Sequence, residues 1–201
     1  MWHDTIRPED VKGRAETSRL LPHDPSRALK IARSIHHPWY RCQALTAVAE
    51  AQHSVPLLIE SFATAYEQTE PNRIVSVASW PLRQLALLEP KMAQVELEKL
   101  INVAATEEHG LRRLHALEKL FFAVASAPLL RQQVPPAFNA TAAVCQGWRA
   151  ERSAAFVGSY LAKFDVPLAE ALLRSRVPNR FAKHALLAIY RREAGDKLAR
   201  S

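Results

Sequence analysis

The sequence is poor in glycine and cysteine, and each shortage excludes a class of protein. Five glycines among 201 residues leave little material for hairpin turns or for a glycine-rich phosphate loop. The two cysteines, Cys42 and Cys145, have no partner at the spacing of a metal site or a redox pair, so both are predicted to be small core residues. No apolar run approaches the length of about 18 residues that a membrane span needs. Residues 1–4 lack the basic flank and apolar stretch of a signal peptide, and we expect a cytoplasmic protein.

Catalytic and metal-binding motifs are also missing. The sequence has no Gly-x-Ser-x-Gly, no His-Glu-x-x-His and no Walker-type loop. The adjacent His36 and His37 have no acidic or thiol residue at i+3 or i+4 that would complete a zinc site. Glu96 and Glu98 are two residues apart and diverge on a helix, which is a poor arrangement for an acid and a base. The sequence therefore predicts a non-catalytic protein with no metal and no cofactor.

The residues that are present favour helices and carry an uneven charge. Apolar residues make up 48% of the chain, and alanine and leucine are abundant, which favours helix over sheet. The net charge is +7, but residues 1–109 hold 12 Lys/Arg against 14 Asp/Glu, whereas residues 110–201 hold 15 against 6. The C-terminal half thus carries all of the basicity. Such asymmetry indicates either an anionic partner or only a soluble basic surface.

Prolines mark a repeat of 31 to 39 residues, because proline is favoured in the first turn of a helix. One series precedes the first helix of each repeat: Pro25, Pro56, Pro90, Pro128 and Pro167. A second series starts the partner helix: Pro38, Pro71 and Pro178, with Gly110 and Gly147 in the same place in the other two repeats.

These prolines and glycines predict an all-α protein of about five helix-turn-helix repeats in one domain, residues 1–201. Residues 1–23 form an N-terminal cap with a helix at 8–21, residues 24–194 form the repeats, and residues 195–201 form a frayed tail. The predicted helix pairs are 25–35 with 38–52, 56–68 with 71–88, 90–106 with 111–126, an irregular helix ending near 145 with 148–164, and 167–177 with 179–194. Pro81 is expected to kink or split the helix 71–88, and Pro135-Pro136 to break the first helix of the fourth repeat.

The first repeat carries a family resemblance. The segments that carry it are Asp24-Pro25, Ala-Leu-Lys-Ile-Ala-Arg-Ser-Ile at 28–35, His37-Pro38-Trp39-Tyr40-Arg41, and Gln-Ala-Leu-Thr-Ala-Val-Ala at 43–49. They resemble the helical hairpins of HEAT-like and tetratricopeptide-like solenoid proteins of bacteria. The Trp, Leu-Gly and Tyr signature of the tetratricopeptide repeat is absent, so the HEAT-like form is preferred. The resemblance implies an α-solenoid scaffold and no activity.

Arginines recur near the start of each second helix, often beside a tryptophan. If the repeats stack regularly, they form a ladder that presents guanidinium groups to carboxylates or phosphates. The alternative is a structural role, in which each arginine pairs with an acid of the next repeat or caps a loop carbonyl, and each tryptophan seals a junction between repeats. The candidate partner-binding residues are Arg41, Arg73, Arg112, Arg113, Arg149, Arg152, Arg180, Trp39 and Trp148.

Two functions fit this pattern. In the first, the chain is a protein-interaction module or adaptor of a larger bacterial assembly, and its concave face binds an acidic peptide or helix. In the second, the basic C-terminal half binds a nucleic-acid backbone without reading the bases. The sequence favours the first function and predicts no membrane contact.

Overall fold

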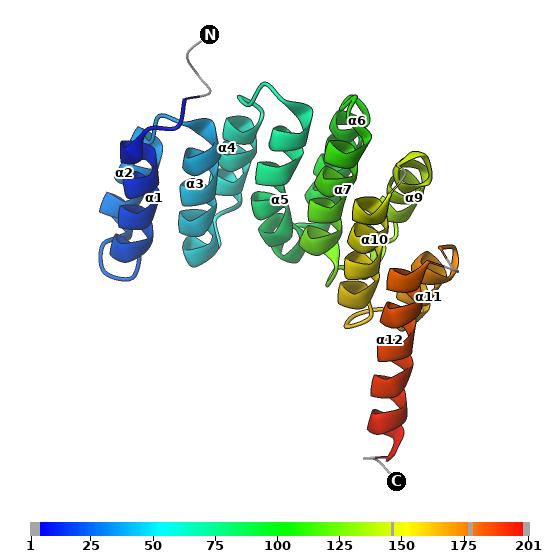
Figure 1. Ribbon diagram of the computed structural model, residues 1–201. Helices are drawn as coiled ribbons and strands as arrows, with labels where there is room; N and C mark the ends of the chain where they lie inside the picture. Colours follow the sequence, from blue (N-terminus) through cyan, green and yellow to red (C-terminus); the bar gives the residue numbers. More distant parts are fainter. Residues whose placement is uncertain (1–4, 146, 177–178, 199–201) are drawn as a thin grey trace. The chain divides into compact units, whose positions relative to one another are not determined.

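The computed structural model describes residues 5–145, 147–176 and 179–198, and this part of the chain is helical with no strand (Figure 1). The helices are α1 (Pro8–Leu20), α2 (Pro25–Ser34), α3 (Pro38–Gln52), α4 (Val55–Ala65), α5 (Pro71–Leu88), α6 (Pro90–Ala105), α7 (Gly110–Val124), α8 (Pro128–Arg131), α9 (Val134–Val144), α10 (Trp148–Leu161), α11 (Val166–Arg174) and α12 (Arg180–Leu198).

Local chemistry explains where these helices begin. Proline lies in the first turn of most of them, as predicted, because its missing N–H has no partner there in any case. Side-chain oxygens of Asp24, Ser54 and Asp165 cap α2, α4 and α11. His37 and His109 cap α3 and α7 through Nδ1, which accepts a backbone N–H. The helices at 38–52 and 71–88 have the bounds that the prolines predict.

Pro81 lies inside α5, and α5 continues through it instead of splitting. Proline has no N–H to donate to the carbonyl four residues earlier, which is that of Val77. The buried thiol of Cys42 in α3 lies 3.7 Å from this carbonyl oxygen and donates to it. Cys42 is thus a core residue, as predicted, and its weak S–H donor partly replaces the missing helical hydrogen bond.

One further predicted break is confirmed and one is corrected. The first helix of the fourth repeat is interrupted, as predicted: α8 ends at Arg131, and a separate helix, α9, begins at Val134 with Pro135 and Pro136 in its first turn, where proline is tolerated. The last helix does not end at Ala194 but continues through Gly195 to Leu198, since a single glycine costs a helix only about 1 kcal/mol. Val177 and Pro178, predicted to end one helix and start the next, lie outside the described residues.

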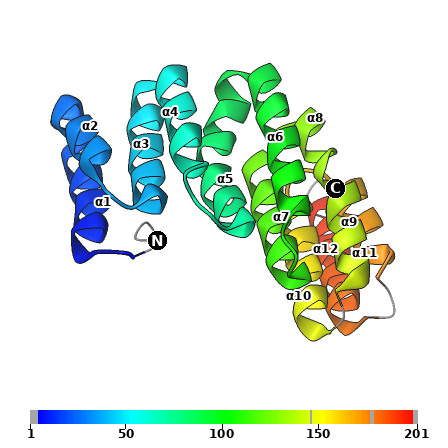
Figure 2. The same ribbon diagram turned by 90° about the horizontal axis from the view of Figure 1, so that it is seen from above.

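The chain divides into two compact units, residues 1–107 and residues 108–201. In the first unit, α1 packs on α3 and α3 on α5, while α2, α4 and α6 cover them from one side. Figure 2 shows these two rows of helices in this unit. Leucines such as Leu45, Leu58, Leu82 and Leu97 fill the space between the rows and are fully buried.

The second unit repeats this arrangement with other helices. Here α7 packs on α10 and α10 on α12, while α9 and α11 lie against this row. Phe121 of α7 and Phe138 of α9 meet edge to face, with ring centroids 5.2 Å apart, and both are fully buried. Gly158 lets α10 approach α11 closely, because a Cβ there would lie 2.6 Å from Leu173 Cγ.

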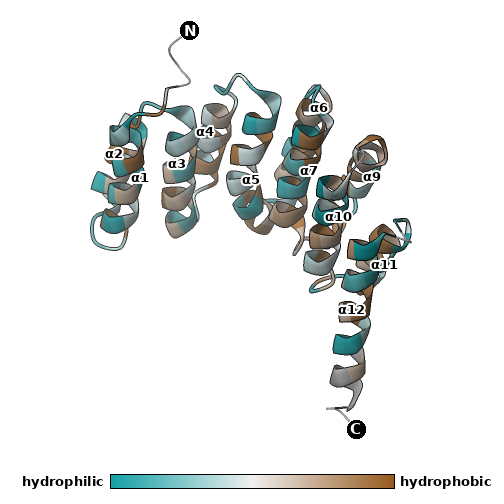
Figure 3. Ribbon diagram, in the orientation of Figure 1, coloured by the Kyte–Doolittle hydropathy of each residue, from teal (hydrophilic) through white to brown (hydrophobic). Residues whose placement is uncertain are grey.

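Hydrophilic and hydrophobic residues alternate around the helices of both units (Figure 3). This pattern is typical of helices that bury one face and expose the other to water. In the described part of the chain, no helix has both the length and the apolar character needed to cross a membrane.

Candidate functional site

Arg41 in α3 has structural partners on both sides. Its guanidinium donates to the carbonyl oxygens of Ile35, at 3.2 Å, and His36, at 3.3 Å, and it forms an ion pair with Glu67 in the turn before α5. Because Ile35 is the C-cap of α2, the cation also lies at the negative end of that helix. Arg41 thus links the turn of one hairpin to the turn of the next.

Arg131 is not among the predicted site residues, yet it makes the same set of contacts in the second unit. Its Nη1 donates to the carbonyl oxygen of Ala125, the C-cap of α7, at 3.1 Å. Its Nε and Nη2 lie 3.1 and 2.9 Å from Oδ2 of Asp165, the N-cap of α11. In both cases the arginine follows the C-cap residue whose carbonyl it binds by six residues. We call an arginine that binds a helix C-cap carbonyl and a distant carboxylate in this way an arginine clip. Arg192 also donates to a helix C-cap, that of α10 at Ala162.

Three other predicted arginines lie close to local partners. Arg73 Nε lies 3.4 Å from a carboxylate oxygen of Glu70 at the start of α5. On α7, Arg112 is exposed and Arg113 is half-buried, and the backbone N–H of Arg112 donates to His109. These three arginines already interact with neighbouring groups, so we do not place them in the candidate site.

Arg149, Arg152 and Arg180 differ from these. All three are exposed, and within the described ranges none of them forms an ion pair with a carboxylate. Arg149 lies over the ring of Trp148, 5.4 Å from its centroid. Arg149 and Arg152 stand in the first turns of α10, and Arg180 starts α12, which packs on α10. Arg149, Arg152 and Arg180 are therefore solvent-facing cations on two helices that pack on each other, and Arg149 and Arg152 line the same pocket.

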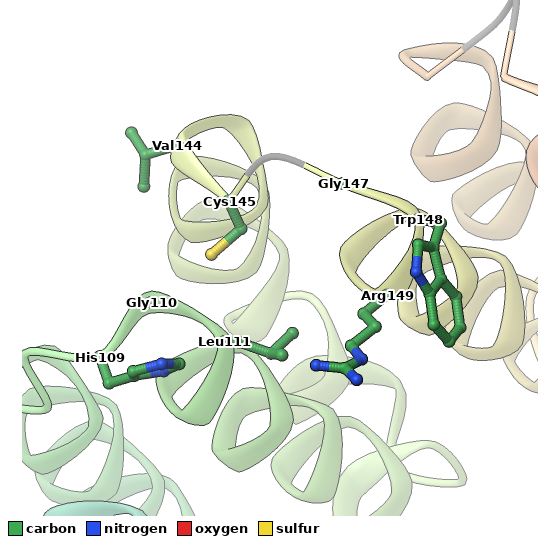
Figure 4. A pocket seen from close by; sticks show the side chains of 8 residues that line it. All are labelled: His109, Gly110, Leu111, Val144, Cys145, Gly147, Trp148 and Arg149. Carbon is green, nitrogen blue, oxygen red and sulfur yellow. The ribbon is translucent and has the colours of Figure 1, made fainter.

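A pocket of about 640 Å³ opens between the starts of α7 and α10. In Figure 4 the guanidinium of Arg149 and the sulfur of Cys145 both point toward the start of α7, near Leu111, whereas Val144 points away. Gly110 lies close to the cysteine, because a Cβ there would lie 2.7 Å from Cys145 Sγ and the cysteine side chain would have to move. The pocket thus combines apolar walls with one exposed guanidinium.

A second pocket, of about 410 Å³, continues along the same two helices and shares Trp148 and Arg149 with the first. Its other lining residues are His115, Glu118, Arg152, Ser153 and Phe156. Ser153 donates to Glu118 at 2.5 Å, so the carboxylate in this pocket already has a hydrogen-bond donor. We call the two pockets together the α7–α10 groove.

The two predicted tryptophans have different surroundings. Trp39 is half-buried in the first unit, where its backbone N–H donates to the cap residue His37. Trp148 lies in the second unit, is 55% exposed and lines both pockets of the α7–α10 groove. Only Trp148 therefore lies beside unpaired arginines.

The described residues between 110 and 192 expose little negative charge. Between residues 110 and 192 the described chain has 13 Lys/Arg and four carboxylates. Each carboxylate has a cationic neighbour, and none is more than 23% exposed. They are Glu118, Glu151, Asp165 and Glu170. What remains exposed to solvent is therefore mainly cationic and attracts anionic groups.

The two cysteines are expected to react differently with a thiol reagent. Burial raises the pKa of the Cys42 thiol to about 12, so little of it is thiolate at neutral pH. Cys145 was predicted to lie in the core, but it is half-exposed because α9 ends there and its sulfur lines the pocket. We expect Ellman's reagent to modify one thiol per native chain and two in denaturant. Loss of the native signal in Cys145→Ser is the check, and rapid modification of both thiols in the native chain would contradict the assignment.

Comparisons with protein-family models, with curated proteins and with solved structures gave no significant match.

Proposed function

We propose that this chain is a non-catalytic adaptor, built as a HEAT-like α-solenoid, that binds an acidic segment of a protein partner in the α7–α10 groove. The two rows of helices in each unit support the solenoid part of the proposal. The observation that carries the binding part is the pairing of exposed Trp148 with two unpaired guanidinium groups, Arg149 and Arg152, in a groove. Tryptophan and arginine are the residue types that most often dominate the binding energy of protein interfaces.

Nucleic-acid binding is the second candidate, and the lack of exposed carboxylates between residues 110 and 192 favours it. A phosphate backbone would meet little repulsion on this surface. Its binding would weaken steeply as salt rises, because each phosphate contact releases counterions. An acidic peptide makes fewer charge contacts and adds apolar ones, so its salt dependence is expected to be shallower.

Charge reversal in the groove tests the proposal. The probes are a fluorescein-labelled peptide of about 16 residues made of Glu and Leu, and a labelled oligo-dT of similar length, titrated by anisotropy at about 50 mM NaCl. We expect Arg149→Glu with Arg152→Glu to weaken peptide binding at least tenfold, because two attractive charges become repulsive. Bound peptide is also expected to slow the modification of Cys145 in the groove.

The matched control is Arg27→Glu with Lys30→Glu, which makes the same change in net charge on exposed residues of α2 in the first unit. It is expected to leave peptide affinity within a factor of two. An equal loss in the control, or no peptide binding by the native chain, contradicts the proposed function. Tighter binding of oligo-dT than of peptide, with a steep salt dependence, supports the second candidate instead.

A further inference from the structure

Aromatic side chains gather on α7, on α10 and in the turn that follows α10. The ring of Phe122 lies edge to face with Phe156, at 5.3 Å between centroids, and with Tyr160, at 4.8 Å. Tyr160 in turn contacts the ring of Phe164 at 5.6 Å. Trp148 lines the same pocket as Phe156 and so extends the row to the start of α10. We call these five residues the aromatic ridge.

The ridge faces solvent although it is strongly apolar. Phe156 is 57% exposed and Phe164 is 42% exposed, and Trp148 is as open as Phe156. The residues at 148, 152, 156 and 160 are spaced by four along α10, so each lies next to the following one on the helix surface, and Phe164 lies four residues further, in the turn after the helix. Four of these five positions are aromatic, and the fifth is Arg152. Contiguous exposed aromatic surface of this kind marks an interaction site.

Cations border the ridge. Lys119 Nζ lies 5.8 Å from the ring centroid of Phe122, and Lys163 Nζ lies 5.4 Å from that of Tyr160. Together with Arg149 and Arg152 they give an apolar strip with positive charge along its length. A partner that matches this strip needs an apolar face with carboxylates on its borders.

We propose that the aromatic ridge binds the apolar face of an acidic amphipathic helix from a protein partner. The inference rests on the proposed function and specifies the secondary structure of the segment that the groove binds. Phe122 and Tyr160 have ring edges and an ammonium group against their rings, which leaves little ring face for a stacked base. A helix, by contrast, packs its apolar side chains against ring edges and faces alike.

The length of α10, which carries Trp148, Phe156 and Tyr160 of the ridge, sets the length of the partner. Helix α10 has 14 residues, which corresponds to about 21 Å at 1.5 Å per residue. A partner helix lying along it therefore needs about 14 residues, or four turns. Its apolar anchors are expected at i, i+4, i+7 and i+11, and its acidic residues beside them, within reach of Lys119, Arg152 and Lys163.

Two peptides of identical composition test this inference. Both have about 16 residues of Glu and Leu, but one places Leu at i, i+4, i+7 and i+11, and the other distributes Leu evenly around the helix. We expect the native chain to bind the amphipathic isomer at least tenfold more tightly in fluorescence anisotropy. Phe156→Glu with Phe164→Glu is expected to remove this preference, and the control Leu129→Glu, at an exposed leucine of α8, is expected to retain it.

The outcomes separate the inference from the proposed function. If both isomers bind equally, and Arg149→Glu with Arg152→Glu abolishes this binding, the inference of an amphipathic helix is overturned. The proposed binding of an acidic segment is then retained. Binding of neither isomer overturns both. A preference that survives Phe156→Glu with Phe164→Glu, while the variant keeps its helical circular dichroism, also overturns the assignment to the ridge.

Discussion

Replacing Arg131 with alanine is expected to lower the free energy of unfolding by about 3 kcal/mol, because it breaks a largely buried ion pair. The Arg131 and Asp165 side chains are only 11% and 16% exposed. Without the guanidinium, the Asp165 carboxylate loses its partner in a poorly hydrated place, and the carbonyl of Ala125 loses a donor. Urea denaturation followed by circular dichroism gives the difference directly.

An exposed ion pair provides the matched control for this experiment. Arg33 and Glu60 lie 2.8 Å apart, with side chains 53% and 35% exposed. Because solvent screens such a pair, Arg33→Ala is expected to cost less than about 1 kcal/mol. If both substitutions cost the same, the arginine clip contributes nothing beyond an ordinary surface pair.

Replacing Asp10 with alanine is expected to have a similarly large effect, about 3 kcal/mol. This buried carboxylate of α1 accepts the backbone N–H groups of His36 and His37, both at 2.9 Å, and that of Arg7 at 3.0 Å. Alanine leaves these donors without their acceptor, at about 1 to 3 kcal/mol for a buried one. Asp10→Asn keeps one oxygen and is expected to cost less. Equal stability of the alanine variant and the native chain would contradict this assignment.

The carboxylate of Asp10 also makes the free energy of unfolding depend on pH. Burial is the strongest influence on Asp10 and raises its pKa, but the hydrogen bonds from His37, Arg7 and His36 together bring the pKa below its ordinary value of 3.8. A depressed pKa in the folded state means that the stabilisation is complete above about pH 3.8 and is lost as the pH falls below it. The stability gap between the native chain and Asp10→Asn is therefore expected to shrink over that range.

The sequence predicts the helices well because their starts are local events. Proline restricts its own φ and favours the first turn, so Pro38 and Pro71 place two helices without knowledge of the rest of the fold. Pro81 does not split α5, and the thiol that donates to the carbonyl left without its helical N–H belongs to Cys42, which is far away in sequence. Similarly, Gly195 does not end its helix.

The structural roles of Arg41 and Arg131 could not be predicted from the sequence, because their partners are distant along the chain. Glu67 follows Arg41 by 26 residues and Asp165 follows Arg131 by 34, and nothing in the local pattern pairs them. Once the helix ends are assigned, the six-residue spacing between a helix C-cap and the arginine of a clip can be recognised in the sequence. The sequence also shows that Trp148, Phe156, Tyr160 and Phe164 are spaced by eight, four and four residues. Only packing shows that Phe122 of α7 contacts the rings of Phe156 and Tyr160, and that Tyr160 contacts Phe164.

The contact between Cys42 and the carbonyl of Val77 has a consequence for how the sequence can evolve. A residue other than proline at 81 would supply the N–H that the carbonyl of Val77 lacks. The hydrogen bond from the thiol of Cys42 would then no longer be needed. Substitutions at 42 and 81 should therefore be coupled among relatives. A proline at 81 should accompany a small donor such as cysteine or serine at 42, and chains without that proline should admit alanine or valine there.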